Sequence, residues 1–281
     1  MKLAIDIGNR NIKIYDGKKT AIIKSMATEK GMNTKNIVEL DGKKIWFGIG
    51  NSLVAQDKTA RKHLKETILL SAYKMFGPKA NEIELRVGLP LNRYKAQKDS
   101  FKKELMGYGN IKGKVDGEEM NITIKEVEVL AEGHAALYKI VEDITILPAA
   151  LLDVGYKTTD VLLLSYDTDG ELQIDSYMTV NMGLKEIYEA IAMDNLTNIG
   201  FLYKAEDIES RLKELDLKAA NMVINEIYNE IESTCYDISK RHIYVIGGGS
   251  KVVYEHLDHN EKTMIDENVA LYANVKGYFE N

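Results

Sequence analysis

Residues 3–15 read LAIDIGNRNIKIY, and residues 150–164 read ALLDVGYKTTDVLLL. In each stretch an apolar strand ends in an aspartate, Asp6 or Asp153, which is followed by one residue and a glycine. A second apolar or alternating segment then begins, so each stretch predicts two antiparallel strands joined by a tight turn. The two aspartates lie close to half a chain length apart. This repetition indicates two related domains, although aspartate and glycine are also common wherever strands turn.

The sequence around these stretches alternates between strand and helix spacing. The first 25 residues predict a three-stranded meander, and Asp41-Gly42 predicts the turn of a second hairpin. Helical spacing follows at 59–76 and again at about 132–141. Apolar residues at helical spacing from Ala205 to Lys240 predict helices with little or no inserted sheet. We therefore expect an α/β protein.

Composition excludes several classes of protein. The 281 residues are 45% hydrophobic and 28% charged, which is typical of a globular protein with a sizeable core. The longest charge-free apolar stretch, Ile144–Leu152, is far shorter than the roughly 20 residues of a membrane helix. Asp6 lies where a signal peptide would need an apolar run. One cysteine, Cys235, allows no intrachain disulfide. We expect a cytoplasmic protein that is neither secreted nor membrane-bound.

The glycine turns after Asp6 and Asp153 suit phosphate binding. A turn with glycine at its bend can point successive backbone N–H groups at phosphate oxygens. Carboxylates at the strand ends could hold magnesium, directly or through water. Lys13, on the second strand of the first hairpin, could turn its ammonium toward the phosphates or be an ordinary solvated lysine.

A third glycine-rich element is VIGGGS at 245–250, where a strand runs into Gly247, Gly248 and Gly249. Such a turn allows a flat group to approach closely, but it can equally serve packing alone. The dinucleotide spacing G-x-G-x-x-G fails at Val252, and the Walker A pattern is absent from the sequence. A nucleotide would therefore have to bind on another scaffold.

Taken in order, DxGxxNxK at 6–13, DVGxxTTD at 153–160 and VIGGGS resemble the phosphate-1, phosphate-2 and adenosine motifs of the actin/sugar-kinase/Hsp70 ATPase superfamily. Gly88–Leu91, the segment 127–137 and the segment 273–278 resemble bacterial plasmid-segregation actins of the ParM/StbA type. The resemblance covers nearly the whole chain.

The resemblance implies a fold of two actin-like (ribonuclease H-like) domains with a nucleotide cleft between them. It places actin-like domain I at 1–148 and actin-like domain II at 149–267, with a C-terminal helix at about 268–281 packing back on the first. The short, helical segment after the second meander implies a reduced insertion in the second domain. Tyr156 and Lys157 depart from the small residues common in relatives, so their side chains either point away from the phosphates or, for Lys157, contact them.

The resemblance also implies roles for individual residues. Asp6 and Asp153 would organise Mg²⁺, through its waters, and would share in catalysis with Glu132. Glu132 would begin the helix that links the domains and would orient the attacking water, although a carboxylate at a helix start is also favoured by the helix dipole alone. The nucleotide, ATP or GTP, would be contacted by Gly8, Asn9, Asn11, Lys13, Gly155, Thr158, Gly247, Gly248 and Gly249.

The implied function is a polymerising ATPase whose cytomotive filaments segregate plasmid DNA through a DNA-bound adaptor protein. The net charge of −6 agrees with an adaptor, rather than the filament, facing the DNA phosphates. The alternative is a small-molecule kinase of the same superfamily, which would need a catalytic base aimed at a substrate hydroxyl. An Hsp70-like chaperone is disfavoured, because we expect no substrate-binding region after residue 281.

Overall fold

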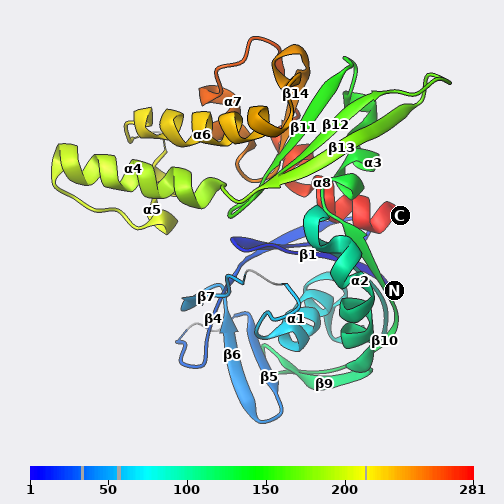
Figure 1. Ribbon diagram of the computed structural model, residues 1–281. Helices are drawn as coiled ribbons and strands as arrows, with labels where there is room; N and C mark the ends of the chain where they lie inside the picture. Colours follow the sequence, from blue (N-terminus) through cyan, green and yellow to red (C-terminus); the bar gives the residue numbers. More distant parts are fainter. Residues whose placement is uncertain (33–34, 56–57, 213) are drawn as a thin grey trace. The chain divides into compact units, whose positions relative to one another are not determined.

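The computed structural model describes residues 1–281 except 33–34, 56–57 and 213, and it divides into two compact units (Figure 1). Unit 1 comprises Met1–Lys139 together with Tyr272–Asn281, and unit 2 comprises Ile140–Leu271. Each unit has its own sheet and its own hydrophobic core. The α/β, two-unit architecture expected from the sequence is therefore confirmed.

Unit 1 is built on a ten-stranded sheet, counted over the described residues. Its strand order is β3-β2-β1-β8-β10-β9-β5-β6-β4-β7. The strands are β1 (Lys2–Ile7), β2 (Asn11–Tyr15), β3 (Thr20–Lys24), β4 (Met26–Thr28), β5 (Ile37–Leu40), β6 (Lys43–Phe47), β7 (Asn51–Ser52), β8 (Glu82–Leu89), β9 (Asn110–Val115) and β10 (Glu118–Ala131). The helices are α1 (Leu64–Phe76), α2 (Leu91–Gly107), α3 (His134–Ile140) and α8 (Glu267–Glu280), of which α3 ends and α8 begins in unit 2.

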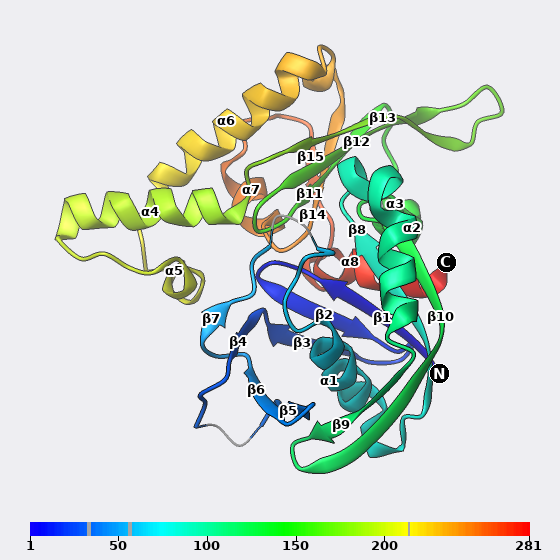
Figure 2. The same cartoon turned by 60° about the horizontal axis from the view of Figure 1, so that its bottom comes forward.

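Unit 2 is built on a sheet of five described strands in the order β13-β12-β11-β14-β15. The strands are β11 (Ala149–Val154), β12 (Thr159–Tyr166), β13 (Leu172–Val180), β14 (His242–Ile246) and β15 (Lys262–Met264). The helices are α4 (Leu184–Ile199), α5 (Ala205–Arg211), α6 (Lys218–Thr234) and α7 (Ser250–His256). Both views show α4 and α6 side by side within this unit (Figures 1 and 2).

Five strands of the unit 1 sheet have the same topology as the five described strands of unit 2. In unit 1, β1, β2 and β3 form an antiparallel meander and β1 then pairs in parallel with β8, which pairs in parallel with β10. In unit 2, β11, β12 and β13 repeat this meander, and β11, β14 and β15 repeat the parallel part. The register agrees as well, because Asp6 lies opposite Lys13 and Asp153 lies opposite Asp160, each seven residues on. The sequence repeat is thus a repeat of structure.

The alternation of side chains along each strand determines which residues face the hydrophobic cores. Leu3, Ile5 and Ile7 on β1 face the main core of unit 1, which also contains residues of α1 and α2. Ala4 points to the opposite face, as the two-residue period requires, and packs there against α3 and α8. In unit 2, α4, α6 and α7 supply the apolar side chains that cover one face of the sheet. β1 and β11 are therefore buried strands, and Asp6 and Asp153 lie near their carboxyl ends.

The structure confirms some expected elements and shifts others. The described residues from 205 to 240 contain helices and no strand, so the predicted absence of an inserted sheet is confirmed. The helix expected from residue 59 begins only at Leu64, because Thr59 and Ala60 form a turn and His63 has a left-handed backbone, with φ 61°. None of the helices described is long and apolar enough to cross a membrane.

The C-terminal helix packs against unit 1 through glycines. A Cβ on Gly277 would lie 1.9 Å from the carbonyl oxygen of Ala135, and one on Gly88 would lie 1.9 Å from the hydroxyl of Tyr278. Real Cβ atoms do not approach so closely. The two glycines therefore let α8 sit directly on α3 and β8.

We predict that Gly277→Ala lowers the free energy of unfolding by about 1–3 kcal/mol, because the overpacking cost exceeds the gain in helix propensity. Gly107→Ala at the end of α2 is the matched control, because a Cβ there meets no atom within 4 Å. This control should be neutral or stabilising by up to about 1 kcal/mol. Urea denaturation measures both, and equal stabilisation by the two variants would contradict the close packing.

Candidate functional site

The first cluster lies where β1 ends and turns into β2. Asp6 is buried, with only 5% of its surface exposed, and Lys13 on β2 extends its ammonium to within 3.3 Å of an Asp6 carboxylate oxygen. A Cβ on Gly8 would lie 2.6 Å from the carbonyl oxygen of Asn11, so the tight turn requires glycine here. Asn9 uses its side-chain oxygen to accept the backbone N–H of Ala55 at 3.1 Å. The turn is thus tied to the loop that follows β7.

That loop contributes Arg61, a residue that sequence reasoning missed. Its guanidinium is buried and donates to the carbonyl oxygens of Ile7 at 3.0 Å and Gly8 at 3.1 Å, and also to the hydroxyl of Ser25. Ser25 in turn donates to the Gly8 carbonyl oxygen at 2.8 Å. Burial lowers the pKa of Arg61 to about 10, so it stays charged at neutral pH. Arg61 therefore fixes the carbonyl groups of the glycine turn.

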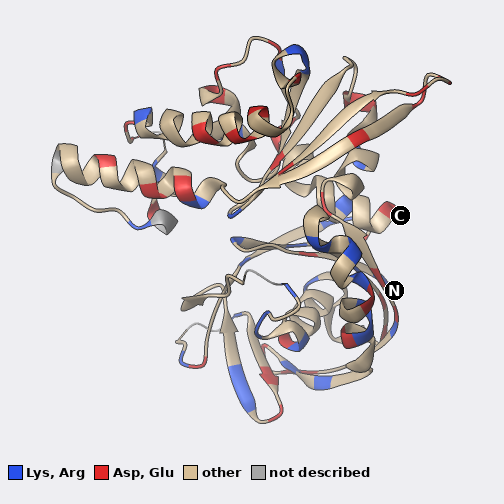
Figure 3. Ribbon diagram, viewed as in Figure 1, with Lys and Arg blue, Asp and Glu red and all other residues tan. Residues whose placement is uncertain are grey.

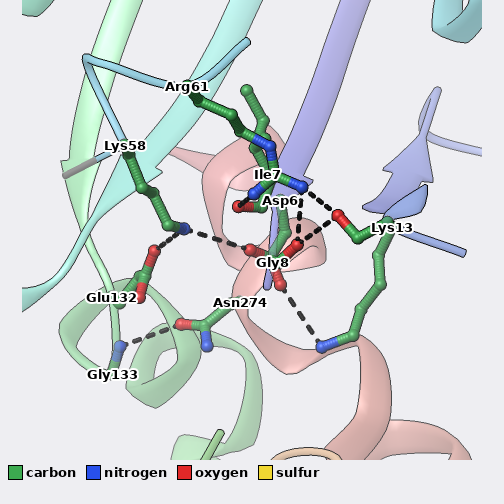
Figure 4. A network of polar contacts seen from close by, with 10 residues as sticks. Asp6, Ile7, Gly8, Lys13, Lys58, Arg61, Glu132, Gly133 and Asn274 are labelled. Carbon is green, nitrogen blue, oxygen red and sulfur yellow. Dashed lines mark hydrogen bonds and ion pairs between the residues drawn. The ribbon is translucent and has the colours of Figure 1, made fainter. Parts of the chain in front are cut away.

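The same loop contributes Lys58, also missed from the sequence. Figure 4 shows its ammonium between two carboxylates, paired with Glu132 on one side and 3.5 Å from Asp6 on the other. Burial would lower the pKa of Lys58, but Glu132 and Asp6 raise it above the ordinary lysine value. Burial likewise would raise the pKa of Asp6, but Lys13 and Lys58 hold it below its ordinary value. Lys58 and Asp6 thus both remain charged at neutral pH.

Glu132 sits in the turn between β10 and α3, not at the start of the helix as expected. The helix begins at His134, because Gly133 adopts a left-handed backbone with φ 69°. The turn is anchored at both sides: Glu132 donates its N–H to the Leu89 carbonyl at 2.9 Å, and Gly133 donates its N–H to the Asn274 side chain at 2.8 Å. The structure therefore brings Asp6, Lys13 and Glu132 into one cluster.

The equivalent turn of unit 2 joins β11 to β12. Asp153 is buried, with 7% of its surface exposed, and the Gly155 N–H donates to the Thr158 carbonyl at 2.9 Å to close the turn. Backbone N–H groups at the start of α4 donate to the carbonyls of Gly155 and Tyr156. The Tyr156 ring packs against the apolar core of the unit. The Tyr156 side chain therefore contributes to the packing of unit 2.

The third glycine element lies directly against this turn. Gly247 has φ 89°, and a Cβ there would lie 2.5 Å from a carboxylate oxygen of Asp153. A Cβ on Gly249 would lie 2.4 Å from the Val154 side chain, whereas the nearest atom to one on Gly248 is 3.8 Å away. Gly247 and Gly249 are therefore required by packing on β11. Gly248 alone has space for an approaching group.

The acids present fit magnesium brought in by a nucleotide better than a resident metal. No group of three or more histidine, cysteine, aspartate or glutamate side chains within the described ranges could hold a metal ion. Magnesium, however, usually binds proteins through one or two carboxylates and takes its other ligands from water and substrate phosphates. Asp6 in unit 1 and Asp153 in unit 2 are buried carboxylates, and each adjoins a glycine turn of its own unit. Lys13 and Lys58 supply positive charge suited to phosphate.

We predict that Arg61→Met lowers the free energy of unfolding by about 2–3 kcal/mol, because it leaves buried carbonyl oxygens of the glycine turn without their charged donor. Arg93→Met on α2, where the arginine is partly exposed, should change stability by less than about 0.5 kcal/mol. Chemical denaturation of both variants tests the difference. If both variants lose the same free energy of unfolding, the hydrogen bonds of Arg61 to the glycine turn do not stabilise the fold.

Comparisons with known proteins agree with this geometry. Residues 4–134 match the family model "Actin like proteins N terminal domain", and residues 151–259 match "Archaeal actin homologue MreB-like, C-terminal". No curated protein sequence gives a significant match.

Three solved structures illustrate the similarity of fold. A non-polymerisable quadruple mutant of pCBH ParM matches with TM-score 0.81 at 22% identity, covering 99% of this chain and 98% of its own. The 15-stranded ParM filament from Clostridium botulinum matches with TM-score 0.79 at 22% identity, covering 99% and 97%. The archaeal actin homologue Ta0583 in complex with ADP matches with TM-score 0.74 at 19% identity, covering 100% and 98%.

Proposed function

The chain belongs to the actin-like proteins, and we propose that it is a filament-forming ATPase that segregates plasmid DNA. The observation that carries the proposal is the cluster at the end of β1. There a glycine turn, two lysines and two carboxylates converge, and unit 2 repeats the same strand, carboxylate and turn. Such an arrangement suits a polyphosphate with its magnesium ion.

In this proposal the two glycine turns hold the β- and γ-phosphates of ATP or GTP. Backbone groups at Gly8 and Gly155 contact the phosphates, with Asn11 and Thr158 at the far ends of the turns. Lys13 faces Asp6 in the structure and would turn its charge toward phosphate oxygens. Gly248 is exposed, and a Cβ there would meet no atom closer than 3.8 Å, which supports approach of an adenosine moiety to its backbone. ADP bound to the archaeal actin homologue Ta0583 supports a nucleotide as ligand.

Hydrolysis would depend on positioning and charge more than on covalent chemistry, as in phosphoryl transfer generally. Magnesium, when bound with the nucleotide, would neutralise phosphate charge, with Asp6 and Asp153 as the carboxylates that organise it. Glu132 would accept a hydrogen bond from the attacking water and so orient it. The backbone of Glu132 is bonded to β8 and that of Gly133 to α8, and the Glu132 carboxylate pairs with Lys58, which also contacts Asp6.

Self-association and an adaptor complete the proposed function. Filaments of ParM from Clostridium botulinum, with a similar fold, support assembly of this chain into filaments. Direct DNA binding is disfavoured: α6 exposes Glu226, Glu230 and Glu232, and the net charge is −6 (Figure 3). We therefore propose that a DNA-bound adaptor protein connects the filament to the plasmid.

We predict that light scattering and negative-stain microscopy show filaments with Mg·ATP or Mg·GTP, and that none form without nucleotide. Phosphate release per chain should rise with protein concentration, because hydrolysis accompanies assembly. Turnover that is constant per chain in dilute solution and requires an added hydroxyl acceptor would instead identify a small-molecule kinase. The absence of both filaments and turnover would contradict the proposed function.

We predict that Glu132→Gln slows hydrolysis by about 10²–10⁴-fold, which is the usual effect of losing one group that handles a proton or water. Binding of a fluorescent ATP analogue should remain close to wild type, because the glycine turns and Asp6 are untouched. Filaments of the variant should assemble with ATP and disassemble slowly. Wild-type hydrolysis in this variant would remove Glu132 from the reaction.

A further inference from the structure

Lys58 connects the two acids of unit 1 to which the proposed function gives different roles. Its ammonium contacts Asp6, the carboxylate assigned to magnesium, and Glu132, the carboxylate assigned to water. The three side chains are 9%, 8% and 13% exposed, so solvent screens their charges only weakly.

The position of Lys58 is fixed by its neighbours in the chain. On one side, the backbone N–H of Ala55 donates to Asn9 in the glycine turn. On the other, Arg61 is bound to the carbonyls of Ile7 and Gly8, and its own N–H donates to the Lys58 carbonyl at 3.3 Å. The loop therefore presents the ammonium at the end of β1, and a long flexible side chain is held at both its base and its tip.

The charges explain why such an ammonium is needed. Asp6 and Glu132 are like charges that approach one cation from two sides, and a bound polyphosphate would add further negative charge. Without Lys58, repulsion would turn the Glu132 side chain away from Asp6 and from the phosphates. A lysine ammonium has three donors, so it can hold both carboxylates at once. The ion pair thus favours one orientation of Glu132.

We propose that Lys58 is a positioning residue that holds the Glu132 carboxylate in the orientation required to align the attacking water, an inference that rests on the proposed ATPase function. Lys58 acts through Glu132, so removing it should impair turnover more than nucleotide binding. A lysine that instead bound the phosphates directly would act independently of Glu132. These two possibilities make opposite predictions for a double-mutant cycle.

The cycle compares wild type, Lys58→Met, Glu132→Gln and the double variant in single-turnover hydrolysis. We predict that Lys58→Met lowers the rate constant by about 10²-fold, the effect of a misplaced catalytic group, while affinity for a fluorescent ATP analogue changes by less than about threefold. In the Glu132→Gln background, Lys58→Met should change the rate constant by less than about threefold. Lys58→Arg should recover part of the rate.

A second measurement uses the chain without nucleotide. Lys58→Met should lower the melting temperature, because Asp6 and Glu132 then lose the cation between them. The double variant should regain part of this loss, because Glu132→Gln removes one of the opposed charges. If Lys58→Met is too unstable for kinetics, the melting temperatures still test the opposed charges, and Lys58→Arg supplies the rate data. Lys62→Met is the matched control, since Lys62 lies exposed in the same loop, and it should match wild type in both measurements.

Several outcomes would overturn the inference. Fully additive rate effects, or an affinity loss of tenfold or more with an unchanged rate constant, would make Lys58 a phosphate ligand. If Lys58→Met hydrolyses nucleotide as fast as the wild-type chain, Lys58 has no role in turnover. The proposed function would still stand in that case, because the wild-type chain hydrolyses the nucleotide. If the wild-type chain hydrolyses neither ATP nor GTP, the proposed function fails, and this role fails with it.

Discussion

The structure of unit 1 is organised around a buried negative charge. Asp6 ends the central strand β1, where a carboxylate is tolerated only if cations compensate it. Lys13 comes from the adjacent strand, whereas Lys58 comes from a loop more than 50 residues away. The need to neutralise one side chain thus draws the hairpin, the loop and the β10–α3 turn together. The cluster to which we assign the proposed hydrolysis is a consequence of that requirement.

Unit 2 uses the same topology with different neighbours. Its carboxylate, Asp153, also ends a central buried strand, but the segment that closes over it is the glycine turn after β14. Gly247 can approach because it has no side chain, and its backbone lies beside the carboxylate. The two halves of the repeat therefore share their strand arrangement and differ in what the structure places beside the carboxylate: two lysines contact Asp6, and a glycine backbone lies against Asp153.

The parts of the structure that could be predicted are those in which apolar residues recur with a regular period along the sequence. The meanders at Asp6 and Asp153 and the helices of 205–240 were predicted because local patterns of burial specify them. Lys58 and Arg61 could not be found in this way, since an irregular loop has no period and their partners are far away in the sequence. The only signal was two cations, separated by two residues, in a polar stretch before a helix. Glu132 was assigned to a helix start because nothing in the sequence showed that Gly133 adopts a positive φ.

The packing of α8 sets the order in which the chain can fold. Unit 1 begins at β1, yet its second face is completed by Val275 and Tyr278, and the Phe279 ring contacts Tyr15 edge-on with a centroid separation of 5.1 Å. A ribosome has therefore made all of unit 2 before the last apolar surface of unit 1 can be covered. Until α8 is made, the Ala4 face of β1 has α3 but lacks Val275 and Tyr278, whereas the strands and helices of unit 2 are continuous in sequence. Unit 2 can thus fold as an insertion before α8 completes unit 1.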